Sequence, residues 1–281
     1  MIVGAKSLGI AAVLAFSTNA AWTQDAISRT VHVFVALADN QHQGIVPVAP
    51  ALGNGDDPEH NLYWGSAYGV KTFFARSPEW GRLGCTQKPE PAILERCVFA
   101  YRMADVYLVA DAYRGIEIKQ AIHDFLDSAA GGGAESIPAT ASNTGPVRKL
   151  PIRAGAALLA YVGHDGLMDF HLPQYPRQRD GTHRDTIVLA CASKQFFTDA
   201  IRTGGAYPLV WTTGLMAPEA YTLQAALDGW IAGENREQIR ERAADAYDKY
   251  QKCGLRQLGG CWSRDGKWTE LWLGPATTED G

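Results

Sequence analysis

The sequence predicts an α/β protein built as a three-layer α/β/α sandwich, with helices on both faces of a mostly parallel sheet. Two observations predict this class. Short apolar runs alternate along the chain with segments that have helical periodicity. The apolar runs are nearly continuous, which is typical of strands buried on both faces of a parallel sheet. Because no segment of the 281 residues has the composition of a linker, we expect one domain.

Five strands are expected, each from a run rich in aliphatic, β-branched or aromatic residues. These runs cover residues 31–38, 106–113, 157–163, 186–192 and 207–213. A long polar loop that contains several glycines is expected after the first strand. The segment between residue 131 and about residue 150 has neither periodicity and is expected to be a loop.

Helices are expected between the strands. Apolar residues recur three and four positions apart at Ile118, Ala121, Ile122 and Phe125, which is helical spacing. Ser193 can cap the helix that follows it, and a proline is favoured in the first turn of another. The expected helices cover residues 63–76, 116–130, 194–202, about 218–233 and 234–252.

Residues 1–21 have the order of a secretory signal peptide. Lys6 precedes an apolar stretch that is too short to span a membrane, and small residues follow at Ala20 and Ala21. We therefore expect an exported protein, periplasmic or extracellular, whose residues 22–281 form the domain. The alternative interpretation of this segment is a buried N-terminal helix. The chain end, with Trp262, Trp268 and Trp272, is expected to be a hairpin or an appendage that follows the last helix.

The five cysteines leave one thiol over if the others pair. Cys85 and Cys97 flank a Pro-containing segment, and Cys253 and Cys261 flank a Gly-rich one. Each pair would contribute about 2–3 kcal/mol to stability by closing a short loop, although four cysteines allow three pairings. The interpretation with local pairs leaves Cys191 as the free thiol.

Composition excludes several classes of function. The formal net charge of −4 argues against a broad nucleic-acid interface. No apolar run reaches the roughly 18 to 20 residues of a membrane-spanning helix, so no span is expected in the mature chain. The sequence lacks a P-loop, a complete Rossmann fingerprint, H-E-x-x-H and G-x-S-x-G. We therefore expect no cofactor and no resident metal.

Two of the predicted strands end at residues whose side chains can act as a base or a nucleophile. His164 follows the strand at 157–163, and Cys191 ends the strand at 186–192. Since ligands bind at the carboxyl ends of parallel strands, adjacent strands would bring the two side chains together. The imidazole and the start of the helix near Ser193 are both expected to lower the pKa of the thiol.

The segments AYVGHDG and VLACAS resemble paired blocks of the caspase-like cysteine peptidases, in which one strand ends in His-Gly and a later one in Ala-Cys-x-Ser. The resemblance covers about residues 157–200. It implies a cysteine endopeptidase that cleaves a polypeptide, with His164 as the catalytic histidine and Cys191 as the nucleophile. Gly163 and Ser193 match flanking positions. Where the family has Gly directly after the His, this chain has Asp165 before Gly166.

Backbone N–H groups at Gly163, Asp165 and Gly166 are the expected donors to an oxyanion. Asp39 and Asp111 are expected to follow strands on the cleft side, together with Ser193. Either carboxylate could orient His164 or recognise a basic substrate residue, and the alternative interpretation of each is a turn residue. Two other functions remain open. The chain could be a catalytically degenerate binding or scaffold protein on the same fold.

The second alternative is a metal-dependent hydrolase. His164, Asp169 and His171 supply the donor types that bind zinc or another divalent cation. In this case the three side chains would have to converge on one point.

Overall fold

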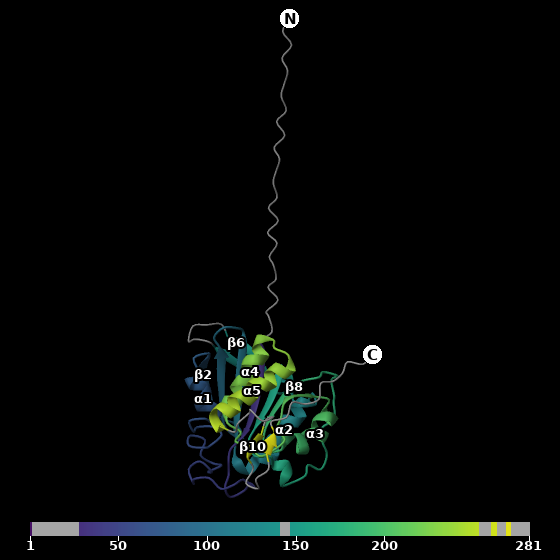
Figure 1. The fold of residues 1–281 in the computed structure, drawn as a ribbon. Helices are drawn as coiled ribbons and strands as arrows, with labels where there is room; N and C mark the ends of the chain where they lie inside the picture. The colour runs from purple at the N-terminus through teal and green to yellow at the C-terminus, as the bar shows by residue number, and fades with distance from the viewer. Residues whose placement is uncertain (2–27, 141–146, 253–259, 263–267, 271–281) are drawn as a thin grey trace.

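The computed structural model describes residues 1, 28–140, 147–252, 260–262 and 268–270, and it has the α/β class that the sequence predicts (Figure 1). A mixed seven-stranded sheet has the strand order β2-β3-β4-β1-β7-β8-β9. Its parallel part contains the five strands that were expected. They are β1 (Arg29–Ala36), β4 (Val106–Tyr113), β7 (Leu158–Val162), β8 (Asp185–Leu189) and β9 (Tyr207–Val210).

Side chains alternate between the two faces of β1, and both faces are covered. Val31, Val33 and Val35 pack on the face with α1 (Val70–Arg76), α4 (Ala220–Ala232) and α5 (Arg236–Gln251). Phe34 and Ala36 pack on the other face, which α2 (Ile118–Ala129) and α3 (Ser193–Gly204) cover. Burial on both sides is the reason that the strand reads as a continuous apolar run.

Four strands were not expected from the sequence. β2 (Trp80–Glu90) and β3 (Ile93–Tyr101) form an antiparallel hairpin that extends the sheet beside β4. β5 (Glu135–Thr140) pairs with β6 (Val147–Ile152) in a separate hairpin, so the prediction of a loop before residue 150 was wrong. β2 and β5 are largely exposed, and polar exposed strands lack the apolar pattern by which strands are predicted.

Two predicted helix starts are corrected. The helix expected from residue 63 begins only at Val70, because the chain turns tightly around the buried Asn61, whose side chain accepts from the Tyr63 N–H. Gly65 allows this turn, since a Cβ there would lie 2.0 Å from the Glu59 carbonyl oxygen. Ser193 is the first residue of α3, and Ala192 occupies the N-cap position without a side-chain cap.

The chain end contains a hairpin, as expected: β10 (Gly260–Trp262) pairs antiparallel with β11 (Trp268–Glu270). Apart from Met1, the predicted signal peptide lies outside the described residues, and so do Cys253 and Trp272. Among the helices of the described chain, none combines the length and apolar character needed to cross a bilayer.

Candidate functional site

His164 and Cys191 follow the carboxyl ends of neighbouring parallel strands, at matching positions in the strand register. Val162 at the end of β7 is the register partner of Leu189 at the end of β8, and each candidate residue comes two positions later. The Gly163 N–H donates to the Leu189 carbonyl at 3.2 Å and so continues the pairing to the edge of the sheet. A Cβ on Gly163 would lie 2.9 Å from the Ala36 carbonyl oxygen. The glycine therefore permits close approach to the strand on the other side.

The imidazole of His164 is held by a carboxylate. Its Nε2 lies 2.7 Å from Asp169 Oδ2, which also accepts from the Gly44 N–H at 3.0 Å. The Tyr161 hydroxyl donates to the His164 carbonyl oxygen at 2.7 Å. With the proton on Nε2 directed at the carboxylate, the Nδ1 lone pair is free to accept a proton. Nδ1 has no partner in the described chain and is not sealed from solvent.

Cys191 is a half-buried free thiol. Its sulfur lies 3.4 Å from the Met216 N–H nitrogen and 3.5 Å from the Met216 carbonyl oxygen. Burial raises the pKa of the thiol, and the nearby Asp165 carboxyl raises it further, whereas the Met216 N–H acts in the opposite direction. The expected net lowering of the thiol pKa is therefore not found. Within the described residues no hydrogen bond joins Cys191 to His164.

A left-handed turn follows the thiol. Ala192 has φ 47° and ψ 31°, a conformation that costs a residue with a Cβ some energy. The Ala192 N–H donates to the Gly214 carbonyl at 2.7 Å, which helps to hold the turn. The Ser193 hydroxyl is fully buried and donates to the Val188 carbonyl at 3.0 Å. Ser193 therefore stabilises the turn. The expectation that its hydroxyl faces a cleft was wrong.

Asp165 has an unusual environment for a carboxyl group. It is fully buried, its Oδ1 accepts from the Leu167 N–H at 3.1 Å, and its Oδ2 has no partner in the part of the chain that the structure describes. Burial raises its pKa from 3.8 to about 7, and the negative charge of Asp169 contributes to this rise. Near neutral pH the group is therefore partly protonated.

Two of the three backbone donors that were expected to bind an oxyanion already have acceptors. The Gly163 N–H binds Leu189, and the Gly166 N–H donates to the His164 carbonyl at 3.0 Å. The Asp165 N–H has no acceptor in the described chain. Of the three expected donors, it is therefore the one that is not already used within the described chain.

The other two carboxylate candidates do not touch His164. Asp39 is a turn residue whose Oδ1 accepts from the Gln41 N–H at 2.9 Å and whose Oδ2 lies 2.8 Å from His42 Nδ1. Asp111 lies inside β4, not after it, and is fully buried against His32 and Arg96.

The three proposed metal ligands do not converge. His164 and Asp169 touch, but His171 does not join them. In the described ranges, the group of three potential ligands that does lie together is Cys85, Glu95 and Cys97.

The expected disulfide between Cys85 and Cys97 is present. The segment that these cysteines flank is the β2–β3 hairpin, in which they are direct cross-strand partners.

Three residues near the thiol were missed by sequence reasoning. Met216 contacts the sulfur through its peptide group, which no side-chain pattern reveals. Tyr63 and Tyr247 are buried close enough to the thiol that a charged sulfur would raise their pKa. Tyr63 lies in the long segment after β1, where the run of glycines, asparagines and aromatic residues was the available signal.

Comparison with models of known protein families, with curated proteins and with solved structures gave no match to this chain.

Proposed function

We propose that this chain is an exported cysteine endopeptidase of the caspase-like type, with Cys191 as nucleophile and His164 as general base. One observation carries the proposal: the two residues follow register-matched positions at the ends of adjacent parallel strands. In α/β sheets this edge is where ligands bind. The AYVGHDG and VLACAS segments, which suggested the resemblance, lie around these two strand ends.

The environment of the imidazole favours the role of a base. Asp169 accepts from Nε2, so it would fix the tautomer and stabilise the imidazolium that forms when Nδ1 takes a proton. The raised pKa of Cys191 makes such a base necessary, because the thiolate is the attacking species. The thiol would have to turn from the Met216 peptide toward the imidazole when substrate binds.

The reaction would then have two stages. The Cys191 sulfur attacks the peptide carbonyl carbon while His164 takes the thiol proton, and the Asp165 N–H donates to the oxyanion. The imidazolium returns its proton to the leaving amine, which gives a thioester. Water, deprotonated by the same imidazole, then releases the acid and restores the thiol.

The disulfide supports the location in this proposal. Cys85–Cys97 is formed, and disulfides persist in secreted and periplasmic proteins. Together with the predicted signal peptide, this favours action outside the cytoplasm on polypeptides.

The test combines thiol labelling with peptide cleavage. Cys191→Ala should abolish both iodoacetamide labelling at this position and cleavage of a peptide library read by mass spectrometry. His164→Ala should reduce cleavage by about 10²–10⁴-fold and slow labelling. His171→Ala is the matched control, since this exposed neighbouring histidine should change neither. Labelling of His164→Ala at the wild-type rate, with no cleavage by wild type, would favour the degenerate binding protein instead.

A further inference from the structure

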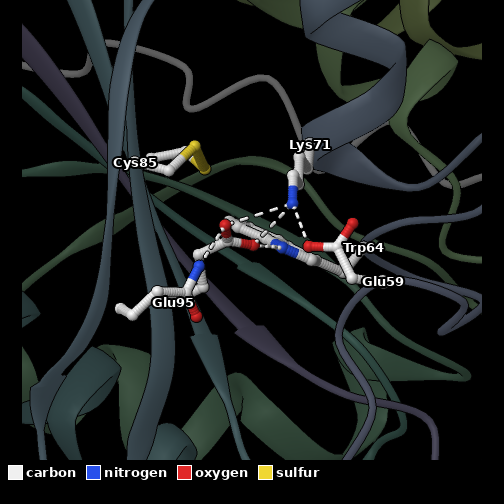
Figure 2. The surroundings of a disulfide bond; sticks show 7 residues. Glu59, Trp64, Lys71, Cys85 and Glu95 are labelled. Atoms are coloured by element: carbon white, nitrogen blue, oxygen red, sulfur yellow. Dashed lines mark hydrogen bonds and ion pairs between the residues drawn. A yellow bond between two sulfur atoms is a disulfide. The ribbon is translucent and has the colours of Figure 1, made fainter.

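A polar cluster around the buried Glu95 lies beside the disulfide (Figure 2). It belongs to the β2–β3 hairpin, which lies on the opposite side of β4 from β1 in the sheet. Glu95 is 2% exposed and lies on β3 two residues before Cys97, so both side chains point to the same face of the hairpin. Its register partner is Gln87, and the register partner of Cys97 is Cys85. The two sulfurs and a Glu95 carboxylate oxygen all lie within 4.8 Å of one another.

We propose that reduction of the Cys85–Cys97 disulfide creates a binding site for a zinc-like divalent cation, with both thiolates and the Glu95 carboxylate as ligands. Two thiolates and one carboxylate are donors that zinc accepts in a tetrahedral site, with water in the fourth position. In the oxidised protein the sulfurs are bonded to each other, so the disulfide and the cation are alternative occupants of one place. This inference is independent of the proposed peptidase activity.

The carboxylate is already arranged to face a cation. Lys71 Nζ lies 3.1 and 3.0 Å from the two Glu95 oxygens, and it also pairs with Glu59 (Figure 2). A metal would displace Lys71 from Glu95, and Glu59 would remain as the partner of the ammonium group.

Two further side chains would orient the carboxylate. The Trp64 indole N–H donates to Glu95 Oε2 at 2.6 Å, and the Gln87 amide donates to Oε1 at 2.8 Å. Outer partners of this kind fix the orientation of a metal ligand and strengthen binding. Cys85 is exposed, so a reductant and the cation can both reach the site.

The redox step needs a dithiol or a phosphine as reductant. A dithiol supplies two electrons and two protons, which break the S–S bond to give two thiols while the reductant forms its own disulfide. The cation then displaces the two thiol protons and binds both sulfurs.

The experiment uses the full chain with Cys191→Ser, Cys253→Ser and Cys261→Ser, so that Cys85 and Cys97 are the remaining thiols. Zinc uptake is measured by competition with a chromophoric chelator before and after reduction by a phosphine that is then removed. The expected result is one equivalent of zinc in the reduced protein and none in the oxidised protein. Cobalt in place of zinc should give a thiolate charge-transfer band and the visible spectrum of a tetrahedral site.

Variants identify the third ligand. Glu95→Gln keeps an acceptor for the Trp64 N–H and should weaken zinc binding about tenfold or more. Glu90→Gln is the matched control on the same hairpin, because that carboxylate pairs with Arg96 and Arg153 instead. Lys71→Met removes the competing cation and should tighten binding several-fold, a gain that misfolding would not produce. The proposal is overturned if the reduced protein takes up no zinc, or if Glu95→Gln binds zinc as tightly as its parent.

Discussion

Two histidine–aspartate pairs of this protein have similar contacts and opposite surroundings. His32 Nε2 lies 3.0 Å from Asp111 Oδ2 in the middle of the sheet, and both side chains are fully buried. His164 Nε2 lies 2.7 Å from Asp169 Oδ2 at the edge of the sheet, where Asp169 is 39% exposed. The pairs differ in whether any hydrogen-bonding atom of the pair remains without a partner.

In the inner pair, His32 and Asp111, both ring nitrogens and both carboxylate oxygens have hydrogen-bond partners. His32 Nδ1 accepts from the Arg153 N–H at 3.0 Å, and Asp111 accepts from two nitrogens of the Arg96 guanidinium, at 2.5 and 2.7 Å. These hydrogen bonds hold the pKa of Asp111 below its usual value despite its burial. In the edge pair, His164 Nδ1 has no hydrogen-bond partner within the described chain. A proton-transfer role needs an atom that is free to bind a proton, so the comparison is consistent with a structural role for the inner pair and with the proposed role of His164 as a base.

The largest expected effect is a loss of stability when the network around the inner pair is broken. Arg96→Met removes the bidentate partner of a fully buried carboxylate, and an uncompensated buried charge costs about 3–5 kcal/mol. The free energy of unfolding, measured by urea denaturation, should fall by this amount. Arg202→Met removes an exposed partner of Asp199 and serves as the control, with no measurable change. Equal stability of the two variants would contradict a structural role for the inner network.

A second pair of variants exchanges one oxygen for nitrogen in each aspartate. Asp169→Asn should lower the rate of peptide cleavage by about 10–100-fold, because it removes the charge that stabilises the His164 imidazolium. Its pH–rate profile should also shift, which a merely structural role for Asp169 would not cause. Asp111→Asn should lower the free energy of unfolding and leave the cleavage rate of the folded fraction unchanged. The same response from both variants would remove the distinction between the pairs.

The parallel core of the fold was predictable because its residues are buried on both sides. β4 was predicted with its observed bounds, and β1 within two residues at each end. β2 and β5 were missed because burial, not local propensity, produces the apolar pattern, and these strands are mostly exposed. The helix expected over residues 63–76 formed only from Val70 onward, for another reason: the Asn61 side chain accepts from the Tyr63 N–H and so competes with helix formation at the expected start.

The site was predictable as far as strand ends determine it. The positions of His164 and Cys191 follow from where two apolar runs stop, since parallel strands bring their carboxyl ends to one edge. The partner of the histidine did not follow, because Asp169, Asp39 and Asp111 are equivalent in a sequence that shows no contacts. The state of the thiol did not follow either, since burial and the Met216 peptide depend on the packed structure.

The smallest expected effect is the one that Asp165 has on the thiol. One oxygen of the Asp165 carboxyl group accepts a hydrogen bond, and the other has no partner within the described chain. Asp165→Asn keeps the acceptor for the Leu167 N–H and removes the charge near Cys191. The pKa of the thiol should fall by about one unit or less. The pH at which iodoacetamide labelling reaches half of its maximum rate should shift down by the same amount.

The same variant should change how stability depends on pH. Since burial raises the pKa of Asp165 from 3.8 to about 7, the folded protein keeps a proton that the unfolded chain releases between these values. The contribution of the group to stability is complete below about pH 4 and is lost as the pH rises through 7. Urea unfolding across this range should show that Asp165→Asn gains stability relative to wild type as the pH rises, whereas the exposed Asp199→Asn should not. A constant difference across the range would mean that Asp165 is ionised throughout, and that its buried oxygen has a partner which stabilises the charge.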